Sequence, residues 1–327
     1  RQRSHVRHGH ELAAVKGEEA IVLNYAVQRL IQAIVAIFGV LTIVFVVMHL
    51  SGDPTLLLVP QDASAEMIAE LRHQLGFDRP IHIQYLDYLY GLTQLDFGIS
   101  VVQRVPALDI VASRLPYTIQ LAAGALVVAI GIGIPAGIVM ATMRGSAIER
   151  ILTAIVVTGQ SVPTFLSAIL LIFIFGVTLR WLPTSGAGEL SAMILPSIAL
   201  GALSMSTFAR MTRIAIIDEL GKDYVRAGRA RGLSLGQVVF RHVLRNASIP
   251  VITIAALEIG NLLAGAVIIE TVFAWPGIGQ LAIQSIQSRD FLVVRVIVLL
   301  ISFVYVLTSL LADLVYVVVD PRIRLVR

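Results

Sequence analysis

Six long apolar runs divide this chain, and they limit its possible folds more than any other feature of the sequence. A helix that crosses the hydrocarbon core of a bilayer needs about 20 apolar residues, and each run approaches or exceeds that length. Charged residues make up only 14% of the chain, against about 25% in soluble proteins. The sequence therefore predicts an all-α polytopic membrane protein with six transmembrane helices. The runs are residues 30–52, 116–143, 151–179, 190–209, 247–269 and 296–312.

The distribution of lysine and arginine between the loops predicts the orientation, because cytoplasmic loops carry an excess of both. Placing both termini in the cytoplasm assigns most basic residues to that side, whereas the opposite orientation leaves the most basic loop outside. The chain then divides into a cytoplasmic tail (1–28), a first transmembrane helix (29–52), an extracytoplasmic segment with amphipathic helices (53–115), a transmembrane core (116–313) with a cytoplasmic loop (210–246), and a cytoplasmic tail (314–327).

The extracytoplasmic segment is acidic and carries a helix signal. Ser64 can cap a short amphipathic helix that ends at Gly76. Its apolar face would consist of Ile68, Leu71 and Leu75. Such a segment is either a lid packed on the helical bundle or a landing site for an external partner, and the two roles are compatible.

The most basic loop, residues 222–250, predicts a helix, a break and a second helix. Gly232 supplies the left-handed residue that ends the first helix, and Ser234 with Gln237 forms a capping box that starts the second. Pro250 limits how the second helix can pass into the next apolar run. The loop either fixes topology beside anionic headgroups or docks a partner. Its basic residues are Lys222, Arg226, Arg229, Arg231, Arg241 and Arg245.

Several apolar runs contain residues that a lipid-facing helix does not need. Gly133 and Gly137 let another helix approach closely, and Pro135 and Pro163 loosen the hydrogen-bond ladder. Polar side chains fall on helical stripes in the third and sixth runs, where they either bond between helices or line a translocation path. The residues assigned to that path are Gln160, Ser161, Thr164 and Ser167 in the third run, of which Gln160, Thr164 and Ser167 share one stripe, and Tyr305 in the sixth.

Glu258 lies inside the fifth apolar run, where a carboxylate costs at least about 2.5 kcal/mol. It must therefore face the bundle interior, a cavity or a cation. Asn261 shares its helix face, and Arg210 and Arg213 are the candidate cationic partners. Glu258 either belongs to the translocation path with Asn261 or forms a structural ion pair.

Residue usage excludes several kinds of site. The chain has no cysteine, which removes disulfides, thiolate catalysis and cysteine metal sites. It has no GxxxxGK[ST] phosphate loop, so it cannot bind nucleotide by that device. His5, His8 and His10 are better explained as a mobile tail than as metal ligands. The net charge of +4 does not indicate nucleic-acid binding, because the basic residues concentrate in loops predicted to be cytoplasmic.

The residue order in the basic loop resembles the EAA loop of ABC-transporter permeases. Tyr224, Val225 and Arg226 are followed by Ala227, Gly228, three residues and Gly232. Arg226 in place of glutamate is typical of the dipeptide, oligopeptide and nickel importer family, whereas glycine in the second alanine position softens the helix by about 1 kcal/mol. Further motifs of that family follow in order at residues 52–54, 75–89, 95–100, 114–118, 272–281, 288–291 and 320–324.

This resemblance implies a type I ABC importer permease fold with a cytoplasmic coupling helix, in the first of two permease subunits. It implies a bacterial inner-membrane importer with a second, homologous permease, two ATP-binding subunits or one two-domain ATPase, and an extracytoplasmic substrate-binding protein. ATP and Mg²⁺ would bind the ATPase partners, and this chain would hold no cofactor. The implied ATPase-coupling residues are Tyr224, Arg226, Ala227, Gly228, Arg229, Arg231, Gly232 and Leu233.

Relatives in this family carry dipeptides, longer peptides, glutathione, nickel chelates or haem, and we expect di- or oligopeptides here. An ion-coupled secondary transporter with Glu258 as proton site is the main alternative, although it would not need the basic loop. An intramembrane enzyme would need a nucleophile with a base or a metal cluster, which the apolar runs lack. A structural scaffold would leave the polar, broken spans unexplained.

Overall fold

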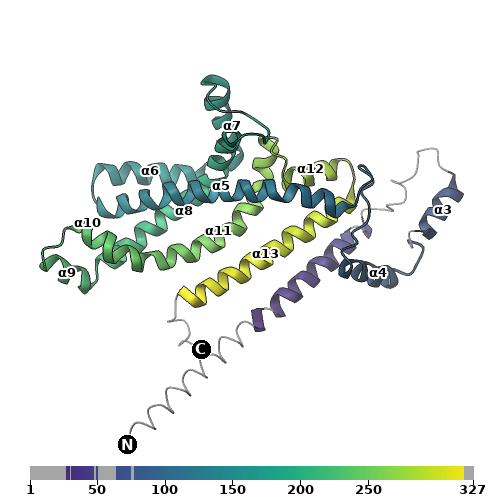
Figure 1. The fold of residues 1–327 in the computed structure, drawn as a ribbon, viewed down its shortest axis with the longest axis horizontal. Helices are drawn as coiled ribbons and strands as arrows, with labels where there is room; N and C mark the ends of the chain where they lie inside the picture. Colours follow the sequence, from purple (N-terminus) through teal and green to yellow (C-terminus); the bar gives the residue numbers. More distant parts are fainter. Residues whose placement is uncertain (1–26, 30, 48, 51–63, 75–76, 320–327) are drawn as a thin grey trace, which may run out of the picture.

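The computed structural model describes residues 27–29, 31–47, 49–50, 64–74 and 77–319, and this part of the chain is almost entirely helical (Figure 1). The histidines at 5, 8 and 10, the motifs at 52–54 and 320–324, and Gly76 lie outside the described residues. Five described helices are long and apolar enough to cross a membrane, or six if one bent pair counts as a single span.

Three long helices form the centre of the bundle: α5 (Ala107–Thr142), α8 (Leu190–Leu220) and α11 (Leu244–Val272). The α5–α8 pair is packed most extensively, and α11 lies against both helices. A Cβ atom added at Gly133 or Gly137 would lie 2.6 Å from a backbone oxygen of α8. The close helix approach predicted at these two glycines is therefore confirmed.

Two of these helices are longer than the apolar runs that predicted them. With 36 residues, α5 is about 54 Å long, which exceeds a hydrocarbon core of about 30 Å. Its charged residues Asp109 and Arg114 end the apolar run without ending the helix. In the same way α8 continues through Arg210 and Arg213 to Leu220. Both helices therefore extend out of the apolar layer.

The third apolar run forms two helices instead of one straight span. α6 (Ala147–Ser161) and α7 (Thr164–Leu171) are bent by 108°, and α7 continues into a π-helical segment, η1 (Ile172–Thr178). Figure 1 shows that α7 runs in a different direction from α6, and it packs against α8 and α11, where Ala168 is buried in the core. Pro163 ends α6 because it has no N–H to donate, and its backbone is extended, with ψ of 139°.

The remaining long helices cover this core. α13 (Phe291–Val319) packs along α11 and extends the short last apolar run in both directions. The helix Val27–Val47 lies against α4 (Ile81–Thr93), where the Thr42 and Tyr85 hydroxyls are 2.7 Å apart. The aromatic rings of α4 thus hold the first helix to the rest of the chain.

The first helix of the segment predicted to be extracytoplasmic begins where the sequence predicted. α3 (Ala65–Gln74) follows Ser64, whose side chain accepts a hydrogen bond from the Met67 backbone N–H at 3.3 Å. Ile68 is half-buried. The predicted cap is confirmed.

One carboxylate holds the short helix α12 (Ile278–Gln287) against one end of the bundle. Glu270, in the last turn of α11, is fully buried. Its carboxylate accepts hydrogen bonds from the backbone N–H groups of Gly279 (2.6 Å) and Gln280 (3.1 Å) and from the Thr118 hydroxyl (2.6 Å). A carboxylate at a helix N-terminus satisfies donors that the first turn leaves unpaired. Glu270 therefore caps α12 from a neighbouring helix.

This contact joins two of the sequence motifs, residues 114–118 and 272–281. The indole N–H of Trp275 donates to the Tyr117 carbonyl oxygen at 2.9 Å, and the two rings meet edge to face. A second pair of motifs, 95–100 and 288–291, meets where the Ser100 hydroxyl donates to the Asp290 carboxylate. Both pairs fasten the α12 end of the bundle, which we call the far end.

Candidate functional site

The predicted elbow forms at the end of the bundle opposite α12 (Figure 1). It consists of α9 (Asp223–Ala230), a turn, and α10 (Leu235–Val238). Gly232 in the turn has a φ of +87°, and the N–H groups of Gly232 and Leu233 donate to the Arg229 and Gly228 carbonyls at 3.0 and 3.3 Å. This is the Schellman pattern that a glycine favours at a helix end. The left-handed residue predicted at Gly232 is confirmed.

The capping box predicted for the second helix is also confirmed. Ser234 Oγ accepts from the Gln237 N–H, and the Gln237 side chain accepts from the Ser234 N–H. The helix that begins here does not end at the elbow. It passes through a π-helical segment, η2 (Val239–Val243), into α11, giving one helix over Leu235–Val272. Pro250 lies inside this helix and does not interrupt it, so it does not limit the passage of the second helix into the next apolar run.

One side of the elbow is packed on the bundle. Val225 of α9 is 4% exposed and lies in an apolar cluster with Val238, Val243 and Ile216. Gly228 faces the same cluster, and a Cβ atom added there would lie 3.5 Å from Val238, an ordinary contact distance. The elbow therefore has room for the alanine that usually occupies this position in the pattern it resembles.

The opposite side of the elbow is exposed and basic. Arg226 pairs with the exposed Asp223 at 3.5 Å and donates to the Gly221 carbonyl at 3.3 Å. Phe240 of η2 is 70% exposed. Together with Leu233, Gln237 and Arg241, Phe240 lines a hollow of about 330 Å³. We call this side the basic surface. It consists of the exposed residues Arg226, Arg229, Arg231, Gln237, Phe240 and Arg241.

The structure divides the predicted coupling residues between these two sides. Arg226, Ala227, Arg229, Arg231 and Gly232 are exposed. The other three are half-buried and contribute to the packing of the elbow as well as to its surface. They are Tyr224, Gly228 and Leu233.

A polar contact that the sequence did not reveal ties the elbow to the bundle. The Tyr224 hydroxyl donates to Glu219 Oε2 at 2.6 Å, and Asn246 Nδ2 donates to the same oxygen at 3.3 Å. Lys222 pairs with the other carboxylate oxygen. Glu219 is only 9% exposed, so these donors replace the water that its charge has lost. Lys222 and Tyr224 are near Glu219 in sequence, but Asn246 is 27 positions away, so a local pattern does not reveal the complete contact.

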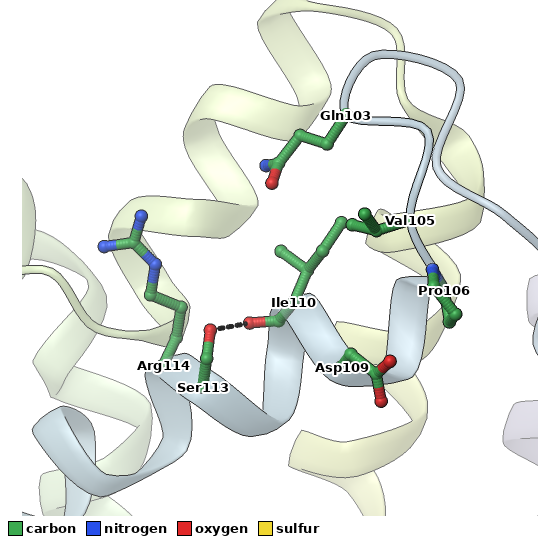
Figure 2. Close-up of a pocket in the computed structure, with 7 residues that line it drawn as sticks. All are labelled: Gln103, Val105, Pro106, Asp109, Ile110, Ser113 and Arg114. Atoms are coloured by element: carbon green, nitrogen blue, oxygen red, sulfur yellow. Dashed lines mark hydrogen bonds between the residues drawn. The ribbon is translucent and has the colours of Figure 1, made fainter.

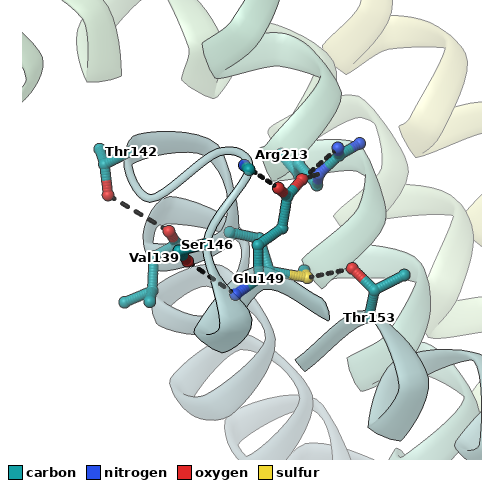
Figure 3. Close-up of polar contacts among 8 residues, drawn as sticks. Val139, Thr142, Ser146, Glu149, Thr153 and Arg213 are labelled. Carbon is teal, nitrogen blue, oxygen red and sulfur yellow. Dashed lines mark hydrogen bonds and ion pairs between the residues drawn. The ribbon is translucent and has the colours of Figure 1, made fainter. Parts of the chain in front are cut away.

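A second contact at the same end joins α6 to α8 (Figure 3). Ser146 Oγ caps α6 by accepting from the Glu149 N–H at 3.1 Å, and the Glu149 carboxylate accepts from the Gly145 N–H at 2.5 Å. Both the Nε and a terminal nitrogen of Arg213 donate to Glu149 Oε1, at 3.1 and 2.5 Å. Glu149 thus connects the loop before α6 to the end of α8.

Of the two alternatives for Glu258, the ion pair with Arg210 or Arg213 does not form. Arg213 binds Glu149, and Arg210 donates to the Gln160 side chain at 3.1 Å. Glu258 is 9% exposed, and the Ser204 hydroxyl of α8 donates to its Oε2 at 2.5 Å. Both arginines lie further along α8, where α6 supplies their partners. Within the described residues, Glu258 has no cationic partner.

The residues assigned to the translocation path do not form one stripe. Gln160 and Ser161 end α6, whereas Thr164 and Ser167 lie on α7 beyond the bend, so the single stripe predicted for the third run is wrong. Asn261 and Tyr305, like Ser161, are exposed on the surface of this chain. The Ser161 hydroxyl donates to the backbone of its own helix.

For the importer function that the sequence predicts, we expect Glu258→Gln to retain the normal protein level and ATP-driven uptake, because an amide oxygen can accept the same bond from Ser204. Glu258→Leu should lower the free energy of unfolding by about 1–3 kcal/mol, since it leaves the buried Ser204 hydroxyl without its acceptor. Membrane protein level and uptake in cells measure both effects. Loss of uptake in Glu258→Gln at a normal protein level would show that the ionised carboxylate acts in transport.

The far end carries a polar hollow of about 330 Å³ where α5 begins (Figure 2). Asp109 and Arg114 lie on successive turns of α5, and the Ser113 hydroxyl between them donates to the Ile110 carbonyl at 2.7 Å. The other lining residues are Gln103, Val105 and Pro106. Among the described residues, no group of three histidine or acidic side chains is placed to hold a metal ion.

The sequence matches two family models. The model described as "Binding-protein-dependent transport system inner membrane component" matches residues 133–325, and the model of the N-terminal part of such components matches residues 22–122. The glutathione transport system permease protein GsiC of Escherichia coli K12 is 41% identical over 304 residues, which are 93% of this chain and 99% of that protein. GsiC of Shigella flexneri serotype 5b is equally similar, with the same identity and coverage.

Solved structures show the same fold. The inward-facing MetNI methionine ABC transporter in its native crystal form aligns with a TM-score of 0.54 and 20% identity, over 65% of this chain and 97% of that chain. A second crystal form of that transporter, soaked with selenomethionine, aligns with a TM-score of 0.56. At this identity the likeness concerns the fold alone.

Proposed function

Because the chain belongs to the binding-protein-dependent transport system inner membrane component family and is a permease subunit of an ABC importer, we propose that it carries short peptides, glutathione among them, across the membrane. The observation that supports this substrate class is the 41% identity to GsiC over nearly the whole of both chains. Glutathione is itself a tripeptide, so the import of glutathione and of short peptides requires recognition of the same backbone amide and carboxylate groups. Nickel chelates and haem, which other members of the family carry, have fewer of these groups in common with peptides.

The energy for import enters through partner subunits. Two ATP-binding subunits, or one two-domain ATPase, bind ATP and Mg²⁺, and this chain has no phosphate loop of its own. The transporter alternates between an inward-facing and an outward-facing state. ATP can shift this equilibrium only by the difference between its binding free energies for the two states. The permease therefore needs a surface on which the ATPase can act.

The basic surface of the elbow is that surface. It presents the exposed side chains of Arg226, Arg229, Arg231 and Arg241, and Arg241 lines one hollow with the exposed ring of Phe240. Arginine and aromatic side chains are enriched at protein interfaces, where arginine forms forked bonds with carboxylates. An ATPase cleft with acidic walls and an apolar floor complements this arrangement. Closure of the ATPase then moves the elbow as a rigid body.

The complete importer contains further partners. A second, homologous permease covers the exposed apolar faces of this chain that do not meet lipid, and an extracytoplasmic substrate-binding protein delivers the substrate at the far end. This places the elbow and both termini in the cytoplasm of a bacterial inner membrane. Ser161, Asn261 and Tyr305, which are exposed in this chain alone, are candidates for the translocation path between the two permeases.

Co-purification followed by uptake tests this proposal. We expect the tagged chain to carry a second permease and ATP-binding subunits through detergent purification. Proteoliposomes of that complex, supplied with its binding protein, should accumulate labelled glutathione or dipeptides only when ATP is inside the compartment that holds the elbow. Uptake that persists without ATP but collapses with the proton gradient would contradict the proposal and support an ion-coupled transporter.

A further inference from the structure

We propose that Glu219, Tyr224 and Asn246 are positioning residues for coupling, which fasten the elbow to two transmembrane helices at once. A displacement of the elbow then reaches both helices together. This inference rests on the proposed function, because it describes how a movement of the ATPase enters this chain. It assigns a role to a buried carboxylate that lies behind the basic surface and does not belong to it.

The three residues belong to three different helices. Glu219 is the second-last residue of α8, Tyr224 is the second residue of α9, and Asn246 lies in the first turn of α11. Glu219 Oε2 accepts from the Tyr224 hydroxyl at 2.6 Å and from Asn246 Nδ2 at 3.3 Å. A single oxygen atom therefore joins the elbow to both helices.

The contact matters for α9, because the other helix of the elbow, α10, already continues into α11. α9 has 8 residues, which is shorter than a helix that is stable alone in water. Only Gly221 and Lys222 connect it to α8, and a two-residue link can absorb a movement by changing its own dihedral angles. The bond from Tyr224 to Glu219 bridges this link. A push on α9 then acts on α8 directly.

A second contact makes the same two helices move as one body. Ser204 of α8 donates to Glu258 of α11 at 2.5 Å, deeper in the bundle than Glu219. The pair α8 and α11 is thus joined by hydrogen bonds at two levels. Glu219 belongs to the level next to the elbow, where a displacement enters.

Tyr224→Phe and Glu219→Leu, which each remove the hydrogen bond, test the proposal in the complete importer. Each is reconstituted in proteoliposomes with its partner subunits and binding protein, and glutathione uptake and ATP hydrolysis are measured on the same sample. We expect about a tenfold fall in substrate moved per ATP hydrolysed, because a hydrogen bond to a charged group contributes about that factor. Retention of the ATPase subunits and the hydrolysis rate should stay within twofold of the unaltered complex.

The matched control is Thr253→Ala on α11. Its hydroxyl donates to the Ile249 carbonyl of its own helix at 3.1 Å, so its loss should not change substrate moved per ATP. The double variant of Glu219 and Tyr224 should move no less substrate per ATP than the more impaired single variant, since both changes remove the same Tyr224–Glu219 hydrogen bond.

Normal transport per ATP in Tyr224→Phe would overturn the inference. So would a loss of ATPase subunits in proportion to the loss of uptake, because the residues would then serve docking. Failure of the unaltered chain to retain any ATPase would instead overturn the proposed function.

Discussion

Replacing Arg226 and Arg229 together by glutamate is expected to abolish ATP-driven uptake, with a fall of about 100-fold or more, while the chain remains in the membrane. Both side chains are exposed on the basic surface, and the two contacts of Arg226, with Asp223 and with the Gly221 carbonyl, lie at that surface. The change places negative charge where an acidic cleft would bind, and like charges at an interface cost several kcal/mol. Uptake in cells and recovery of ATPase subunits on the tagged chain measure the effect.

Arg144 and Arg150, both replaced by glutamate, provide the matched control. They are exposed at the same end of the bundle, in the loop before α6 and in its first turn, and lie outside the basic surface. The change in net charge is the same, so any effect on membrane topology through the loss of two loop arginines is shared. Equal loss of ATPase subunits in both double variants, or normal uptake in the first, would contradict docking at the basic surface.

Gly277→Ala is expected to destabilise the chain by about 3 kcal/mol or more, the largest effect we predict for removal or addition of a single methyl group. A Cβ atom added at Gly277 would collide with the carboxylate of Glu270, which is fully buried and fixed by backbone donors of α12. The φ of Gly277 is −94°, a value that alanine adopts without strain, so the cost is the collision alone. A lower midpoint of thermal unfolding in detergent and a lower membrane level would show it.

Gly188→Ala separates the collision from the general effect of losing a glycine. Gly188 precedes α8 at the far end, and a Cβ atom added there meets nothing within 4 Å. We expect this variant to unfold at the normal temperature or slightly above it, because alanine restricts the unfolded chain. A thermal midpoint for Gly277→Ala that matches that of Gly188→Ala would show that Glu270 can move, and that it does not fix α12.

The features that the sequence predicted well depend on residues close together in the chain. Gly232 and the Ser234–Gln237 pair predicted the helix end and the new helix start that form the elbow, because a left-handed residue and a capping box depend on the local backbone alone. Gly133 and Gly137 predicted the approach of α8 for a similar reason, since their spacing leaves one helix face without side chains.

Proline was informative only in part. Pro135, Pro196 and Pro250 lie inside α5, α8 and α11, whereas Pro163 separates two helices that are bent by 108°. A proline removes one hydrogen bond in every case. Whether the helix continues depends on whether neighbouring helices satisfy the freed carbonyl, and the sequence around the proline does not contain that information.

The polar contacts were the least predictable part of the site. Arg213 has Glu149 as its partner instead of Glu258, and Glu219 meets Asn246 across 27 positions of sequence. Such pairs depend on the rotation of one helix against another, which apolar periodicity fixes only coarsely. Glu270 lies directly after the fifth apolar run, so the sequence indicates only the end of a transmembrane helix there. The structure shows that its side chain is fully buried.

The unbroken helix over Leu235–Val272 gives the transporter a lever. With 38 residues it is about 57 Å long, and it starts at the elbow and ends at the carboxylate that caps α12. A tilt of this helix by about 5° around its elbow end would move its other end sideways by about 5 Å. A small tilt produced at the elbow would thus displace the other end of this helix, at the opposite membrane face, by a distance comparable to the width of a dipeptide. No flexible segment between the two ends would be needed.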